Sequence, residues 1–187
     1  MYKLPPLDSL GLTGFTVSSA NMYIGSGRDI SKGKISNNPL DYTVHLPSFG
    51  FDLQRPLCWT VRQKREWIWS ILKRRPLPPV AVSENILPDD SSVIYVIDGK
   101  QRLSTLAEFL NHGFCLEADT KTRLSQLPED YQKRLLFLPI QGYVAYDLTE
   151  KQMLQWFRWI NFAGTEQDAE HLAKLDKAYD RLSRAAK

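Results

Sequence analysis

"VIDGKQRLST", residues 96–105, is the stretch that decides how this chain folds. An apolar, β-branched run ends at Asp98, Gly99 marks a turn, and an apolar pattern with helical spacing follows at once. The stretch therefore predicts a corner at which a strand passes into a helix. The first N–H groups of a helix carry partial positive charge and attract anions, phosphate above all.

The side chains at this corner predict a cradle for the phosphates of a nucleotide. Gly99 lets the backbone approach a ligand closely, and Lys100 and Arg102 add full positive charges. Asp98 is expected to bind Mg²⁺, to orient a water molecule or to pair with Arg102, and Gln101 to position a water molecule or a ribose hydroxyl. The alternative is an ordinary Asp-Gly turn with solvated cations, since the stretch matches neither the P-loop nor the G-x-G-x-x-G pattern.

The rest of the chain predicts a mixed class, α/β (mixed α+β), because strand-like and helix-like segments alternate. Residues 1–40 are rich in turn formers and are expected to form a lead-in to a single domain at 41–187. The expected strands lie at 15–20, 42–46, 80–85, 91–98 and 140–148. Helices are expected after Thr60, over 103–112, over 127–137, after Thr149 and after Gly164, and T-x-x-Q spacing predicts a capping box at the two threonines.

Composition bounds the class of protein. The 187 residues are 43% hydrophobic and 24% charged, which is ordinary for one globular domain. No apolar run approaches the roughly 20 residues that cross a bilayer, and no secretory signal is recognised, so we expect a cytoplasmic protein without membrane insertion. Cys58 and Cys115 are expected to be reduced core residues, and the three scattered histidines do not predict a zinc site.

A second candidate site is the basic helix after Thr60. Its cations usually form a solvated face, but they could instead contact a DNA backbone. The candidate DNA-binding residues are Arg62, Arg65, Lys73 and Arg74, with Lys64 and Arg75 beside them. The net charge of +3 permits a nucleic-acid partner without requiring one. Trp59 could stack on a base or be buried, and Trp156 and Trp159 could line the core or a partner surface.

Three segments in order resemble one family of the ParB/sulfiredoxin superfamily. "DGKQRLSTL", residues 98–106, resembles its DGQQR motif, which L-[ST]-T-L usually follows. "LQRPLCW", residues 53–59, resembles its Q-R-P-x-x-W motif, and "FRWINFAGT", residues 157–165, resembles F-x-x-I-N-x-x-G-T. The resemblance covers roughly residues 42–175 and implies a compact domain with a small mixed sheet and flanking helices.

The resemblance also implies a site. ATP or another NTP, with Mg²⁺, would be bound by Gln54, Arg55, Gly99, Lys100 and Arg102. The implied catalytic residues are Asp98, Gln101 and Arg102, with Asp98 as the metal ligand. The family includes the N-terminal part of modification-dependent restriction enzymes, which bind and hydrolyse nucleotides. It also includes short plasmid-borne proteins, one of which inhibits fertility by suppressing conjugative DNA transfer.

Departures from the family pattern shape the functional expectation. Lys100 replaces the usual first glutamine, no cysteine stands at the corner, and no HNH-type nuclease segment follows. We expect an NTP-hydrolysing protein, with DNase activity of its own or through a partner, that acts on conjugative DNA transfer. DNA and a conjugation or secretion-apparatus protein are the expected partners. The alternative is a non-enzymatic inhibitor or adaptor that binds DNA or protein and retains a vestigial nucleotide corner.

Overall fold

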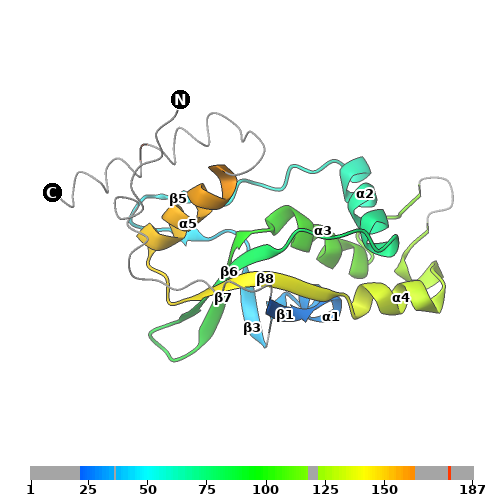
Figure 1. Cartoon of the computed structure of the whole chain (residues 1–187), viewed down its shortest axis with the longest axis horizontal. Helices are drawn as coiled ribbons and strands as arrows, with labels where there is room; N and C mark the ends of the chain where they lie inside the picture. The colour runs from blue at the N-terminus through cyan, green and yellow to red at the C-terminus, as the bar shows by residue number, and fades with distance from the viewer. Residues whose placement is uncertain (1–21, 36, 118–121, 163–176, 178–187) are drawn as a thin grey trace.

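The computed structural model describes residues 22–35, 37–117, 122–162 and 177, and it confirms the predicted mixed class. Helices and strands alternate along the chain (Figure 1). The helices are α1 Gly27–Ser31, α2 Val61–Leu72, α3 Lys100–Leu110, the 3-10 helix η2 Leu124–Gln126, α4 Glu129–Leu136 and α5 Glu150–Phe162. The strands are β1 Met22–Ser26, β2 Lys34–Ile35, β3 Asn38–Asp41, β4 His45–Leu46, β5 Phe51–Asp52, β6 Val80–Ile86, β7 Ser92–Asp98 and β8 Pro139–Tyr146.

The main sheet is mixed and has the strand order β1-β8-β6-β7-β3-β2. The hairpin of β6 and β7 is antiparallel, and Val82 pairs with Val96. On the other side β6 runs parallel to β8, and β3 runs parallel to β7. The strand that leads into the corner is therefore an inner strand, hydrogen-bonded to β6 and β3.

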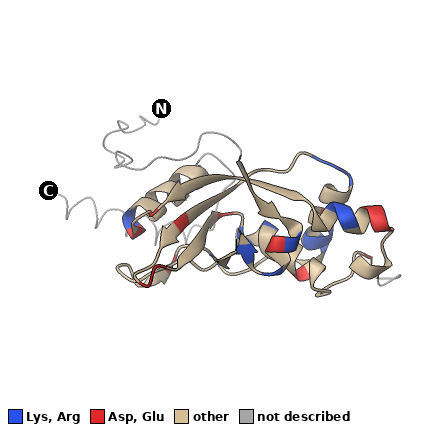
Figure 2. Ribbon diagram, turned by 90° about the horizontal axis from the view of Figure 1, so that it is seen from below, with Lys and Arg blue, Asp and Glu red and all other residues tan. Residues whose placement is uncertain are grey.

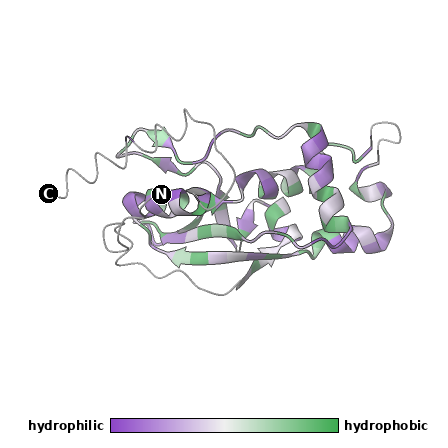
Figure 3. Cartoon of the chain, turned by 45° about the horizontal axis from the view of Figure 1, so that its top comes forward, coloured by the Kyte–Doolittle hydropathy of each residue, from purple (hydrophilic) through white to green (hydrophobic). Residues whose placement is uncertain are grey.

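Two hydrophobic cores lie on opposite faces of this sheet. Val80 and Val82 belong to the core that α1, α2, α3 and α4 cover, whereas Ala81 belongs to the core that α5 and the β4–β5 hairpin cover. This alternation is the period-2 pattern of a strand buried on both faces. Figure 1 shows α5 and β5 at one end of the molecule and α2 and α4 at the other. Figure 3 shows hydrophobic and polar bands alternating along the strands and helices.

The two predicted capping boxes are present where the T-x-x-Q spacing placed them. The Thr60 hydroxyl oxygen accepts a hydrogen bond from the Gln63 N–H at 3.3 Å, and the Gln63 side chain accepts one from the Thr60 N–H at 2.9 Å. Thr149 and Gln152 make the same reciprocal pair before α5. Each pair satisfies donors that a helix start leaves open, so these boundaries follow from local sequence.

The first third of the chain differs from the sequence prediction. The strand expected at 42–46 is confirmed only at His45–Leu46, which is β4, because the Asp41 carboxylate accepts hydrogen bonds from the N–H groups of Thr43 and Val44 and turns the chain before it. Val44 accordingly has a positive φ of 52°. Residues 22–41, expected to be a loose lead-in, contribute three short strands and α1. The strand expected at 15–20 and the helix expected after Gly164 lie outside the described residues.

Two further expectations concern cysteines and membranes. Cys58 and Cys115 are both free, as predicted, but Cys58 is exposed and is not a core residue. Within the described ranges, no helix is long and apolar enough to cross a membrane.

Candidate functional site

The three motif segments, far apart in the sequence, meet around one pocket, which we call the corner pocket. Its volume is about 710 Å³. Its lining combines the loop before α2, the corner between β7 and α3, and the last turns of α5. The residues are Gln54, Arg55, Trp59, Gln63, Pro78, Asp98, Gly99, Lys100, Gln101, Arg102, Phe157, Ile160 and Asn161. The structure thus brings together every residue that the sequence assigned to nucleotide binding or catalysis.

Gly99 makes the corner possible. It is the N-cap of α3 and has a φ of 110°, a left-handed conformation that other residues rarely adopt. A Cβ atom at this position would lie 2.5 Å from Cγ1 of Val80. No side chain caps α3, so its first N–H groups face the pocket without an intrahelical acceptor. The corner therefore offers the partial positive charge on which the phosphate prediction rests.

Replacing Gly99 with alanine should lower the free energy of unfolding by about 2 kcal/mol, because the positive φ alone costs 1–2 kcal/mol and Val80 must also move. Chemical denaturation followed by tryptophan fluorescence measures the change. The matched control is Gly33→Ala, since Gly33 has a φ of +67° but no heavy atom within 4 Å of the added Cβ. Equal losses in the two variants would show that Val80 does not restrict position 99.

Arg102 is bound mainly by protein atoms. Its guanidinium donates to Oδ2 of Asp98 at 2.6 Å and to the carbonyl oxygens of Pro78 at 2.5 Å and Pro79 at 3.1 Å. The side chain is 13% exposed, and burial lowers the pKa of the Arg102 guanidinium while Asp98 opposes that change. These contacts attach α3 to the segment that leads into β6. A direct contact between Arg102 and phosphate stays a prediction.

Both glutamines of the motifs also bind backbone atoms. Gln54 is buried, and its amide donates to the carbonyl oxygens of Val96 and Ile97 near the end of β7. The Gln101 amide donates to the carbonyl oxygen of Pro56 at 3.0 Å, and its oxygen accepts from the Cys58 and Trp59 N–H groups at 3.1 and 3.4 Å. The two side chains fix the loop before α2 against the corner and so determine the shape of the pocket.

Two cations of the pocket differ from Arg102, because they make no hydrogen bond or ion pair with any described residue. Arg55 and Lys100 are half-buried and come from different segments. Burial lowers the pKa of Lys100, and the more distant charges of Asp52 and Asp41 oppose that change. Two half-buried positive charges without a protein partner are an arrangement that an anionic ligand would stabilise.

The carboxylate of the pocket is Asp98, and its side chain is 34% exposed. One oxygen accepts from Arg102, and no described group donates to the other. No group of three or more His, Cys, Asp or Glu side chains in the described ranges could hold a metal ion. Mg²⁺ is commonly bound through one or two carboxylates together with substrate phosphates, so Asp98 fits Mg²⁺ only alongside a bound phosphate ligand.

The predicted DNA-binding residues of α2 lie outside the corner pocket and do not share one surface. Arg62 is exposed and pairs with Glu66 at 3.1 Å, whereas Arg65 donates to the carbonyl oxygen of Cys115. Lys73 lies 5.7 Å from the centre of the Trp69 ring. Arg74 follows the helix at a positive φ of 55°. Figure 2 shows several Lys and Arg segments at the end of the molecule that holds α2 and α4.

The structure also adds residues that sequence analysis did not assign. Phe157 and Ile160 of α5 and Gln63 of α2 line the corner pocket, together with Asn161, which the third motif placed beside the site. The F-x-x-I-N spacing of the third motif was the available signal for the α5 residues, since positions three and four apart share one face of a helix. On the same helix Trp156 is buried in the core and Trp159 is 58% exposed.

The comparisons with known proteins place the motifs in one domain. Residues 34–185 match the family model described as the GmrSD restriction endonuclease, N-terminal domain. The match covers most of the 187 residues and includes all three motif segments. No curated protein and no solved structure matches the chain.

Proposed function

Because the chain belongs to the family of GmrSD restriction endonuclease N-terminal domains, we propose that it acts on DNA and that its corner pocket binds and hydrolyses a nucleoside triphosphate. The observation that carries the proposal is the pair of cations without a protein partner among the described residues, Arg55 and Lys100, in one pocket with the uncapped start of α3. Anionic oxygens would accept hydrogen bonds from Arg55, from Lys100 and from the N–H groups at the start of α3. Such a set of donors suits the phosphate chain of a nucleotide.

In the proposed reaction the residues mainly position and stabilise charge. Lys100 and Arg55, which come from different segments, hold the phosphates, and the N–H groups of α3 bind their oxygens. The free oxygen of Asp98 accepts a proton from a water molecule as that water attacks the terminal phosphorus. The bond to the bridging oxygen breaks, and the nucleoside diphosphate leaves. If Asp98 instead holds Mg²⁺, the ion would neutralise charge on the phosphates. Arg102 and Gln101 keep Asp98 and the loop before α2 in place.

The first test is a nucleotide titration with and without Mg²⁺. Lys100→Ala should weaken ATP binding about tenfold, because a hydrogen bond to a charged group contributes roughly 1.5–3 kcal/mol. Arg55→Ala should act similarly. Lys32→Ala removes an exposed cation that lines none of the pockets and serves as the control, with affinity unchanged. Equal affinities in Lys100→Ala, Arg55→Ala and wild type would contradict the phosphate assignment.

A second candidate function is a non-enzymatic adaptor. The observation that favours it is that Gln54, Gln101 and Arg102 all bind backbone atoms, as they would in a purely structural corner. An adaptor would show no ATP binding in the same titration and would keep its DNA or protein partner when Lys100 is replaced. The titration therefore separates the two functions.

A narrower proposal concerns the biological target. The resemblance to plasmid-borne fertility-inhibition proteins supports an action on conjugative DNA transfer, with a conjugation or secretion-apparatus protein as partner. Expression in a donor cell should then lower the frequency of plasmid transfer. An unchanged frequency would limit the proposal to action on DNA.

A further inference from the structure

A groove beside α2 contains three tryptophans, two of which, Trp67 and Trp69, do not line the corner pocket. We call it the tryptophan groove; its volume is about 690 Å³, and Trp59, Trp67, Trp69, Lys73 and Arg75 are among its lining residues. The rings of Trp59 and Trp67 lie with their centres 6.1 Å apart and their planes at 63°. Trp67 and Trp69 are only partly buried. The groove therefore combines aromatic surface with two cations, Lys73 and Arg75, and one carboxylate, Glu66.

The tryptophan groove shares lining residues with two other pockets. Trp59 and Gln63 line both this groove and the corner pocket. Arg75 lines both this groove and a third pocket of about 640 Å³ between α2 and α4, which we call the arginine pocket. The three hollows are thus neighbours along α2, whose 12 residues span about 18 Å, and we call this row of hollows the track.

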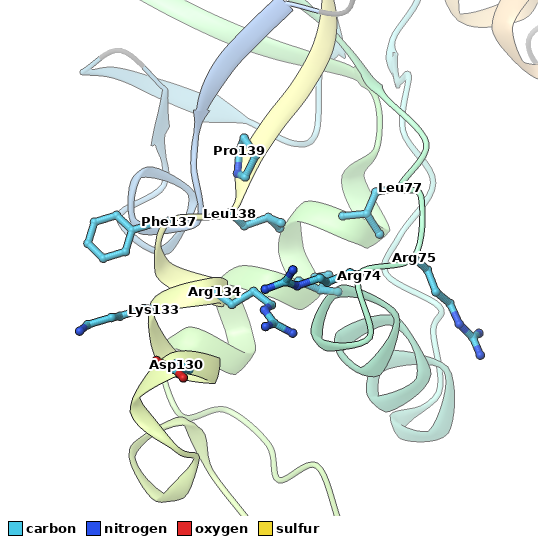
Figure 4. A pocket seen from close by; sticks show the side chains of 10 residues that line it. Arg74, Arg75, Leu77, Asp130, Lys133, Arg134, Phe137, Leu138 and Pro139 are labelled. Carbon is cyan, nitrogen blue, oxygen red and sulfur yellow. The ribbon is translucent and has the colours of Figure 1, made fainter.

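The charge of the far end of the track is strongly positive. Figure 4 shows the side chains of Arg74 and Arg134 in the space between α2 and α4, with Arg75 and Lys133 pointing outward. Arg134 donates to the Leu72 carbonyl oxygen and lies 5.3 Å from the Tyr131 ring centre, so its position is fixed. The side chains of Arg74 and Arg75 make no hydrogen bond or ion pair with any described residue. Asp130 is the one carboxylate that lines this pocket.

We propose that this track binds an unpaired segment of DNA, with bases against the tryptophans and phosphates against Lys73, Arg74 and Arg75. The inference rests on the proposed action on DNA and adds the form of the substrate. Tryptophan faces stack on bases, and a duplex hides its base faces, so stacking selects a single strand. A length of 18 Å corresponds to about five nucleotides at 3.4 Å per nucleotide.

The geometry favours a nucleic acid over an acidic protein. The groove offers three tryptophans together with cations, with Lys73 5.7 Å from the Trp69 ring centre and Arg75 shared with the arginine pocket. A strand of DNA presents both bases and phosphates, which suits a groove that offers aromatic rings and cations together. The groove also holds one carboxylate, Glu66, which pairs with the exposed Arg62 at 3.1 Å.

The experiment measures binding of a fluorescein-labelled 12-nucleotide oligo-dT and of the matching duplex by anisotropy, without nucleotide. The double variant Lys73→Ala/Arg75→Ala should bind the single strand about tenfold more weakly, and its salt slope should fall by about 1.4, because each lost phosphate contact contributes about 0.7. The matched control Lys32→Ala/Lys34→Ala removes two exposed cations that line none of these three pockets and should change affinity less than twofold. Trp69→Phe should reduce the quenching of tryptophan emission by the oligonucleotide.

The outcomes separate this inference from the nucleotide site. Equal losses in the two double variants, or a duplex that binds as tightly as the single strand, would overturn the track. Binding of ATP without binding of oligo-dT would overturn the track and leave the corner pocket standing. Binding of oligo-dT in a protein that fails to bind ATP would support the track and contradict the nucleotide proposal alone.

Discussion

Asp98→Asn should reduce the rate of NTP hydrolysis by roughly 100-fold or more, the scale of losing a positioned general base. Asparagine has the same shape and keeps an oxygen that can accept from Arg102, so the fold and most of the nucleotide affinity should remain. What disappears is the free carboxylate oxygen that accepts the proton of water. Turnover, affinity and melting temperature, measured on one preparation, check the prediction.

The control for this substitution is Asp90→Asn. Asp90 lies in the exposed turn between β6 and β7 with a positive φ of 62°, a conformation that asparagine tolerates well. The Asp90→Asn substitution therefore changes the same chemical group outside the corner pocket, and it should leave the rate of NTP hydrolysis unchanged. If Asp98→Asn is folded and hydrolyses NTP at the wild-type rate, Asp98 serves only as the partner of Arg102.

Arg102→Ala should lower the free energy of unfolding by about 3 kcal/mol, because it removes one member of a mostly buried ion pair. The substitution also leaves the carbonyl oxygens of Pro78 and Pro79 without their donor. Since these residues lead into β6, the loss should reach the centre of the sheet. Urea denaturation measures the change, and nucleotide affinity should fall with it because the wall of the corner pocket shifts.

Two further variants test whether the loss of stability in Arg102→Ala arises because the pair of Arg102 and Asp98 is mostly buried. Arg62→Ala breaks an exposed pair with Glu66, 88% and 63% exposed, and should cost less than about 0.5 kcal/mol. Arg102→Lys keeps the charge but lacks the planar group that reaches Asp98 and both carbonyls, so its stability should be intermediate. A loss below about 1 kcal/mol in Arg102→Ala would mean that the segment before β6 is held by other contacts.

Much of the secondary structure could be predicted because its signals are local. The strand pair 80–85 and 91–98, the two capping boxes and the turn at Gly99 each depend on residues within a few positions of one another. The short strands of residues 22–41 could not be predicted, since elements of two to five residues are too short for a periodic pattern. Their positions depend on pairing with β7 and β8.

The same distinction applies to the site. The sequence by itself determined a glycine corner with a carboxylate, an amide and two cations at the start of a helix. Only the tertiary structure decided that Arg102 and Gln101 bind backbone atoms 23 to 45 residues away, while Lys100 binds no described residue. Every residue has a carbonyl oxygen, so the sequence cannot indicate which one a guanidinium or an amide will meet. That choice depends on how the loops before α2 and β6 pack against the corner.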